Sequence, residues 1–114
     1  KDKAKKFGFD DIVQFATFDD KSEKCLDFLR TKSSKFDVIM IDTSHSYEHT
    51  LCELIIYSSL TSEKGVIILH DTIESTGYGV RRAVLDFLTI NKNFNVLMDI
   101  TEPPAGLMIL EMKT

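Results

Sequence analysis

The 114-residue sequence predicts an α/β domain in which helices cover a largely parallel sheet that ends in an antiparallel hairpin. Two observations carry this prediction. Short apolar runs alternate along the chain with segments of helical periodicity. The last two runs, at 94–100 and 107–113, are separated by residues 101–106 alone, too few for the crossover between parallel neighbours.

The first part of the chain is expected to supply a helix end, a strand and a complete helix. Residues 1–7 are predicted to finish a helix that Gly8 closes as a C-cap. Residues 12–18 are rich in β-branched and aromatic side chains, which is typical of a strand. Residues 22–31 place apolar side chains on one face of a predicted helix.

Two further strands are predicted from runs that are apolar without alternation, at 36–42 and 66–71. Such runs are typical of strands covered by helices on both faces of a parallel sheet. The segments at 47–60 and 80–90 have helical periodicity. Strand and helix thus alternate through the middle of the chain, as in an α/β domain.

Charge and composition narrow the classes of function. The formal net charge is -4, and the sequence lacks the clustered Lys and Arg of a nucleic-acid-binding domain. No apolar run approaches the roughly 20 residues of a membrane span, and no signal-peptide pattern opens the chain. Cys25 and Cys52, both in predicted helices, fit buried thiols in a reducing compartment. We therefore expect a cytoplasmic protein with neither nucleic acid nor membrane as a partner.

Carboxylates end two of the predicted strands. Asp42 closes the strand at 36–42, and Asp71 closes the strand at 66–71. Ligands of parallel sheets bind beyond the carboxyl ends of the strands, and neighbouring strands lie about 5 Å apart. Two carboxylates at that distance repel each other unless a cation lies between them, and Mg²⁺ prefers such oxygen ligands. The sequence therefore predicts a divalent-cation site at Asp42 and Asp71.

Two histidines flank this acidic pair, His45 and His70. Imidazole, with an ordinary pKa of about 6.5, is suited to act as a general base. The structural alternative is that each Asp caps a turn or helix, which is common for a single Asp after a strand. The pair together, each with a nearby His, favours the functional interpretation. His49 lies inside the following helix and is predicted to be a surface residue.

The chain resembles the class I S-adenosylmethionine-dependent methyltransferases in three stretches, "FDVIMIDTSHSYEHTLCEL", "SSLTSEKGVIILHDT" and "GVRRAVLDFL". The most similar branch carries the motif D-G-D-H-S-Y-E and includes macrocin-type sugar O-methyltransferases and cephalosporin-hydroxylase-like proteins. The resemblance implies a Rossmann-like three-layer sandwich with the strand order 3-2-1-4-5-7-6. Residues 1–114 would then form a single, partial domain that supplies strands 3 to 7 and lacks the first two.

The resemblance also implies roles for the residues at the strand ends. Asp42 and Asp71 occupy positions at which the family binds a divalent metal, and His70 is a weaker candidate ligand. His45 stands where the motif has its histidine, near the acceptor, and is the predicted general base. Ser44 replaces the second Asp of the motif, so metal binding is expected to be weak.

The binding site for the cofactor, S-adenosylmethionine, is expected to be incomplete. Asp19 or Asp20 falls where the family contacts the adenine, and the spacing does not decide between them. The Gly-rich loop for the methionine end and the acid for the ribose are both missing. The G-x-G at 77–79 follows an irregular segment rather than a strand, so it is expected only to lead into the helix at 80–90.

The leading prediction is therefore a metal-assisted O-methyltransferase of a small hydroxylated molecule such as a sugar. In-line transfer of the methyl group would depend mostly on positioning and charge stabilisation. The main alternative is a non-catalytic interaction module that keeps the fold and has lost the cofactor loop. A metal-dependent, hydroxylase-like relative is a third option. The coding sequence upstream of Lys1 would discriminate between the first two.

The strand at 12–18 would lack its family neighbours within this chain. An apolar strand with two free edges invites pairing. We expect it to pair with missing parts of the protein, to shift beside the strand at 36–42, or to join another copy, which makes a homo-oligomer one expected outcome.

Overall fold

A four-stranded sheet forms the centre of the molecule. The computed structural model describes residues 2–8, 12–74 and 77–113. The sheet contains β1 (Phe36–Ile41), β2 (Thr61–His70), β3 (Phe94–Ile100) and β4 (Leu107–Met112), in the order β1-β2-β4-β3. β1 and β2 are parallel, whereas β4 is antiparallel to both β2 and β3. The predicted adjacency of the first two strands and the predicted hairpin are confirmed, and the order matches 4-5-7-6 of the implied family sheet.

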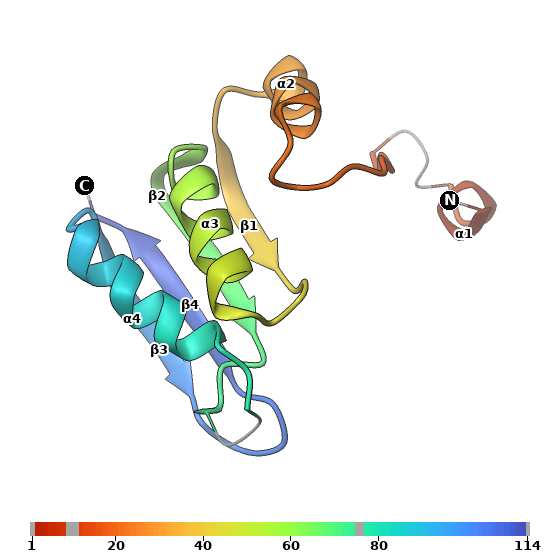
Figure 1. Ribbon diagram of the computed structural model, residues 1–114. Helices are drawn as coiled ribbons and strands as arrows, with labels where there is room; N and C mark the ends of the chain where they lie inside the picture. Colours follow the sequence, from red (N-terminus) through yellow and green to blue (C-terminus); the bar gives the residue numbers. More distant parts are fainter. Residues whose placement is uncertain (1, 9–11, 75–76, 114) are drawn as a thin grey trace.

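Two helices cover one face of this sheet (Figure 1). They are α3 (Tyr47–Ser58), which connects β1 to β2, and α4 (Val80–Ile90), which connects β2 to β3. Their apolar side chains pack against the sheet and form a core that is largely inaccessible to solvent, and its fully buried members include Leu54, Ile67, Leu69, Ala83, Val84 and Leu110. Burial of each large aliphatic side chain contributes roughly 1.5–3 kcal/mol.

Two helices precede the sheet, α1 (Asp2–Lys6) and α2 (Glu23–Lys32). Gly8 follows α1 with a positive φ of 77°, which agrees with the predicted C-cap. A small cluster of Leu26, Tyr57 and Leu60 joins α2 to the end of α3. Among the described helices, none has the length and apolar character needed to cross a membrane.

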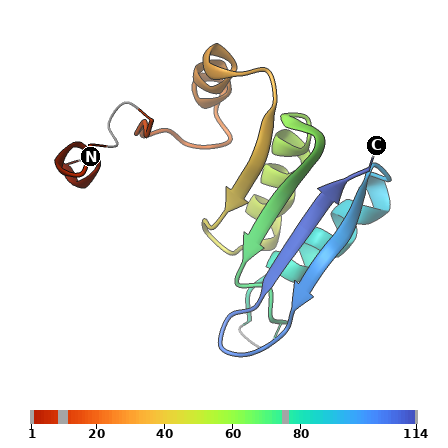
Figure 2. The same ribbon diagram turned by 180° about the vertical axis from the view of Figure 1, so that it is seen from behind.

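The other face of the sheet is open in the described part of the chain (Figure 2). Val38 and Met40 of β1 project there and remain 61% and 59% exposed. The α/β class is thus confirmed. The described residues do not form the second layer of helices that was predicted for this face. Only the β1–β2 pair is parallel, because the hairpin of β3 and β4 makes both remaining pairs antiparallel.

The strand predicted at 12–18 is wrong. Residues 13–19 have no regular secondary structure, and Ile12 and Phe15 are 76% and 51% exposed. A segment with high strand propensity forms a strand only where a neighbouring segment pairs with its backbone. The described residues provide no such partner, and the expected pairing beside the strand at 36–42 is not seen. Pairing with another part of the protein or with another copy stays a prediction.

The start of β2 also differs from the prediction. The strand begins at Thr61 instead of residue 66, so the segment at 61–65, which was predicted only to end the preceding helix, belongs to the strand. Thr61 pairs with Phe36 at the start of β1, and its hydroxyl donates to the carbonyl of Tyr57. These contacts extend the strand across residues whose polar composition gives no strand signal.

Candidate active site

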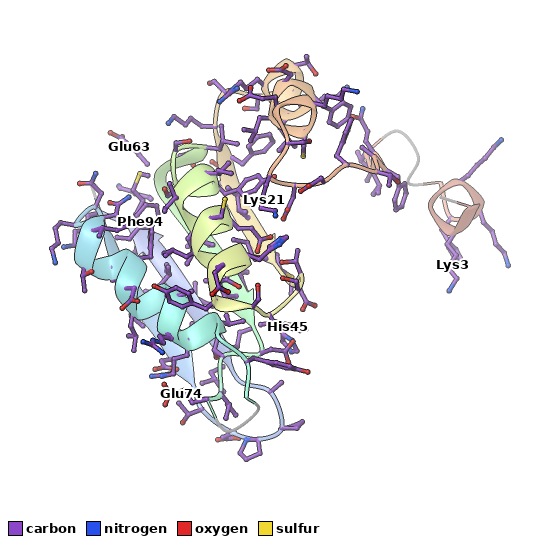
Figure 3. The ribbon with its side chains drawn as sticks, in the orientation of Figure 1. Lys3, Lys21, His45, Glu63, Glu74 and Phe94 are labelled. Carbon is purple, nitrogen blue, oxygen red and sulfur yellow. The ribbon has the colours of Figure 1, made fainter. Side chains whose placement is uncertain are left out.

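The parallel pairing of β1 and β2 brings the predicted site residues to one edge of the sheet. Ile41 is in register with Leu69, so the chain leaves the two strands side by side at Asp42 and His70. Asp71 is the next residue after His70, the last residue of β2. His45 lies in the loop that leads from β1 into α3, beside the first turn of that helix (Figure 3).

The four predicted side chains converge. His45 Nε2 lies 2.6 Å from Asp71 Oδ2 and 3.6 Å from Asp42 Oδ1. His70 Nδ1 lies 3.0 Å from the same Asp71 oxygen and 3.8 Å from Asp42 Oδ1. Donor atoms of Asp42, His45 and Asp71 all lie within 4.8 Å of one another, which matches the roughly 5 Å expected if both carboxylates are to reach one cation.

Unusual backbone conformations direct two of these side chains. His45 has a φ of 65° and Asp71 a φ of 60°, in the left-handed region that non-glycine residues rarely adopt. Conformations of this kind cost on the order of 1 kcal/mol each and persist where surrounding contacts hold them. The carbonyl of His45 accepts a hydrogen bond of 2.9 Å from Gly79 N. Such strain is concentrated at functional sites, so it supports a role for this edge of the sheet.

The G-x-G segment supports the ring of His45. Gly79 caps α4, as predicted, and its Cα lies so close to Tyr47 that an added Cβ would be 2.6 Å from Tyr47 N. This close approach places Tyr78 against His45, with stacked rings whose centroids are 4.4 Å apart. The segment therefore both starts α4 and positions the predicted base.

The donor groups at this edge fit a divalent cation. His45 Nε2 and His70 Nδ1 are enclosed, yet neither has a hydrogen bond of acceptable geometry, although carboxylate oxygens lie nearby. Nitrogen and carboxylate oxygen atoms that face one point are the ligands that divalent cations use in proteins. Ser44, at the missing acidic position, is exposed, and its hydroxyl lies 3.4 Å from that of Ser46.

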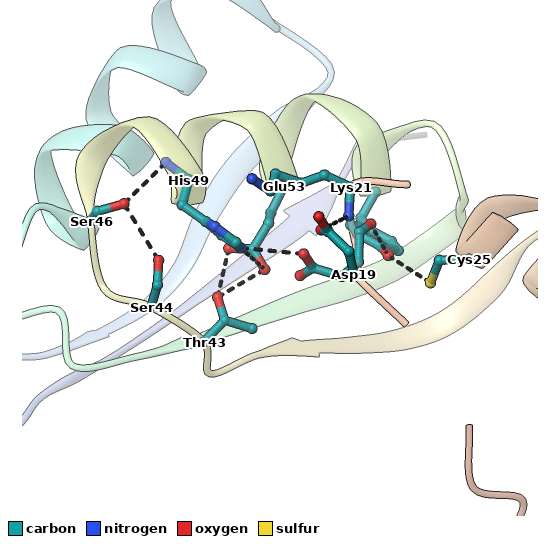
Figure 4. Close-up of polar contacts among 10 residues, drawn as sticks. Asp19, Lys21, Cys25, Thr43, Ser44, Ser46, His49 and Glu53 are labelled. Atoms are coloured by element: carbon teal, nitrogen blue, oxygen red, sulfur yellow. Dashed lines mark hydrogen bonds and ion pairs between the residues drawn. The ribbon is translucent and has the colours of Figure 1, made fainter. Parts of the chain in front are cut away.

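A second cluster of titratable groups lies on α3, where the prediction for His49 is wrong. The side chain of His49 is 23% exposed, and its Nε2 lies 3.2 Å from Asp20 Oδ1 and 3.5 Å from Glu53 Oε2. Glu53 is only 1% exposed. Thr43 Oγ1 donates to Glu53 from 2.8 Å (Figure 4). Burial, followed by the side chain of Asp20, raises the pKa of Glu53 to about 8, although the hydrogen bond from Thr43 opposes this shift.

The two residues predicted to contact adenine face different surroundings. Asp20 points toward His49, whereas Asp19 is exposed and its Oδ1 accepts a hydrogen bond of 3.0 Å from Lys21 N. Neither belongs to the cluster at the ends of β1 and β2. Their contact with a cofactor stays a prediction.

The second cluster has a signal in the sequence that the prediction for His49 overlooked. The buried positions of α3 recur with helical spacing at Thr50, Glu53, Leu54 and Tyr57. A glutamate on the apolar stripe of a helix requires a partner, because a buried carboxyl group without one is costly. His49 is four residues before Glu53 and lies on the same side of the helix.

The chain belongs to the methyltransferase-domain family, whose model matches residues 2–72. The matched segment contains every residue of both clusters. No curated protein matches the chain.

Two solved structures share the fold. One is a "putative rRNA-methylase" from Clostridium thermocellum, with a TM-score of 0.71 and 20% identity over 99% of this chain. The other is SMU.1697c, a "putative methyltransferase" from Streptococcus mutans in complex with SAH, with a TM-score of 0.66 and 13% identity over 97% of this chain. The chain spans only 64% and 66% of these two proteins.

Proposed function

We propose that this chain forms the acceptor side of an S-adenosylmethionine-dependent O-methyltransferase that acts on a small hydroxylated molecule, such as a sugar. The observation that carries the proposal is the convergence of Asp42, His45 and Asp71 at the carboxyl ends of β1 and β2, in a member of the methyltransferase-domain family. S-adenosylmethionine as the cofactor is supported by the structural relative that is in complex with SAH.

In this proposal, Asp42 and Asp71 hold a divalent cation, and His70 is a weaker ligand. When bound, such a cation would stabilise negative charge on the acceptor oxygen. The imidazole of His45 accepts the proton of the acceptor hydroxyl, and the carboxylate of Asp71, which lies 2.6 Å from His45 Nε2, stabilises the imidazolium that results. The acceptor oxygen then bonds to the methyl carbon while the bond from that carbon to the sulfonium sulfur breaks.

The test is transfer of a labelled methyl group from S-adenosylmethionine to a panel of sugars and polyhydroxylated metabolites. It uses the complete gene product that carries this chain, because the structural relatives are longer. His45→Ala is expected to lower kcat by about 10²- to 10⁴-fold, the usual contribution of a general base. Asp71→Asn should lower both the rate and its dependence on added Mg²⁺ or Mn²⁺. Glu63→Gln is the matched control, because Glu63 is exposed near the opposite end of β2.

Two results would contradict the proposal. Full activity in both His45→Ala and Asp71→Asn would remove this cluster from the reaction. Transfer to RNA, without transfer to any small hydroxylated molecule, would exclude the proposed acceptor class.

A non-catalytic module is the second candidate, and Ser44, which stands where the motif has its second Asp, favours it. The G-x-G at 77–79 precedes α4 and does not follow a strand. Calorimetry with S-adenosylmethionine and SAH separates the candidates. A folded gene product that binds neither compound supports the module, whereas binding of both supports the enzyme.

A further inference from the structure

We propose that Asp20, His49 and Glu53 form a second metal site, which takes a divalent transition cation of the Zn²⁺ type. This site shares no residue with the cluster of Asp42, His45 and Asp71.

The distances between the donor atoms fit one small cation. His49 Nε2 lies 3.2 Å from Asp20 Oδ1 and 3.5 Å from Glu53 Oε2, and the three donor atoms lie within 4.8 Å of one another. Two ligands of a tetrahedral cation, each bound at about 2.05 Å, are about 3.3 Å apart. The observed separations involving His49 straddle this value, so little movement is needed to bind an ion.

The three ligands are presented by well-anchored elements. His49 and Glu53 are four residues apart on α3 and therefore share one face of the helix (Figure 4). Asp20 comes from the turn before α2, and its carbonyl accepts a hydrogen bond of 2.6 Å from the hydroxyl of Tyr57, one turn after Glu53. A metal site requires ligands that are held in this way.

Two of the ligand groups are poorly satisfied without a cation. His49 Nε2 is enclosed but has no hydrogen bond of acceptable geometry. Glu53 is almost fully buried, and Thr43 Oγ1 lies 2.8 Å from both of its carboxyl oxygens. A hydroxyl group has one proton, so it cannot donate a full hydrogen bond to both oxygens at once. Burial of an unpartnered imidazole nitrogen and of a carboxyl group costs free energy, and a cation bound to both groups would offset that cost.

The ligand set selects the kind of metal. Imidazole suits Zn²⁺ and related transition metals, whereas Mg²⁺ prefers oxygen ligands throughout. Three protein ligands leave the fourth tetrahedral position free for water, as in open zinc sites. There is space for a water molecule beside two of the ligands, because Asp20 and Glu53 border a pocket of about 320 Å³ that Cys25 and Tyr57 also line.

The experiment is a titration of the metal-free protein with Zn²⁺ and with Mg²⁺. Calorimetry measures the affinity, and thermal unfolding measures the change in Tm. We expect His49→Gln and Asp20→Asn each to lower the affinity for one equivalent of Zn²⁺ by at least about tenfold. Both should also remove the rise in Tm that this equivalent produces. Asp42→Asn with Asp71→Asn is the matched control for the first cluster and should leave this equivalent in place. Thr43→Val retains all three ligands and should retain binding.

Cobalt provides a second readout. Co²⁺ in place of Zn²⁺ should give the intense visible absorption of a tetrahedral complex in the wild type and not in His49→Gln. Circular dichroism of each variant separates lost binding from lost folding, and the side chains of His49 and Asp20 are both partly exposed.

Three results would overturn the proposal. The first is a wild type that binds no Zn²⁺, which would mean that a proton shared between the carboxyl groups holds the cluster together. The second is Zn²⁺ binding that survives His49→Gln but is lost in the Asp42 and Asp71 variants. The third is equal affinity for Zn²⁺ and Mg²⁺ at the His49-dependent site.

Discussion

At the scale of single residues, His45 takes its orientation from groups that are distant in the sequence. Its Nε2 contacts Asp71, its ring stacks on Tyr78, and its carbonyl accepts a hydrogen bond from Gly79. These contacts hold a positive φ that the isolated loop would avoid. The predicted base is therefore preorganised by the end of β2 and the start of α4.

Removing the ring of Tyr78 should loosen His45. Tyr78→Ala is expected to lower kcat for methyl transfer by up to about tenfold, because an aromatic pair contributes about 0.5–1.5 kcal/mol. Tyr78→Phe keeps the stacked ring and should keep the rate. The measurement is kcat and KM for both variants with one accepted substrate. Equal losses in the two variants would attribute the effect to the hydroxyl group instead of the ring.

At the scale of elements, α3 connects the two clusters. The hydroxyl of Ser46 caps the helix by accepting a hydrogen bond from His49 N, and His45 precedes this cap by one residue. The buried stripe of the same helix then carries Glu53. A shift of α3 would therefore disturb both clusters at once.

The contact between α4 and β3 is expected to depend on pH. Arg81 donates to Asp99 through Nη1 at 3.0 Å and Nη2 at 2.6 Å, and this bidentate contact lowers the pKa of Asp99 below its usual value. Asp99→Asn should lower the free energy of unfolding by about 0.5–1 kcal/mol at pH 7, since the pair is partly exposed.

The sign of the pH dependence follows from the lowered pKa of Asp99. The stabilisation is fully present above the unfolded pKa of about 3.9 and is lost as pH falls through the lower folded pKa. Urea unfolding of the wild type and Asp99→Asn at several pH values should therefore show a difference that shrinks in acid. A difference that stays constant down to pH 2 would contradict this assignment.

At the scale of the whole molecule, packing is one-sided. The large core lies between the sheet and the helices α3 and α4, while the opposite face exposes apolar side chains of β1 and β3. The segment at 13–19 lies outside that core and has no regular structure. The stability of the molecule is therefore concentrated in residues 36–113.

Limited proteolysis should reveal this uneven stability. Chymotrypsin is expected to cleave first at Phe15 or Phe18, because both are exposed in irregular backbone. Mass spectrometry of early products should show a long fragment that begins at Ala16 or Asp19. Early cleavage inside β3 or β4 would show instead that the hairpin opens before the segment at 13–19 is cut.

Local patterns in the sequence determined much of this fold. The apolar runs of β1 and β2, the short link between β3 and β4, and the spacing of α4 all act over a few residues, so they predicted these elements and the edge where Asp42 and Asp71 meet. The convergence with His45 followed because parallel strands end together.

Only the tertiary structure decided the features that depend on distant partners. Residues 12–18 have the composition of a strand but no described neighbour with which to pair, and Thr61 joins a strand because Phe36 lies beside it. His49 is drawn inward because Asp20, 29 positions earlier in the numbering, comes to lie 3.2 Å from it. Propensity is local, whereas pairing and the proximity of charged groups depend on how the whole chain packs.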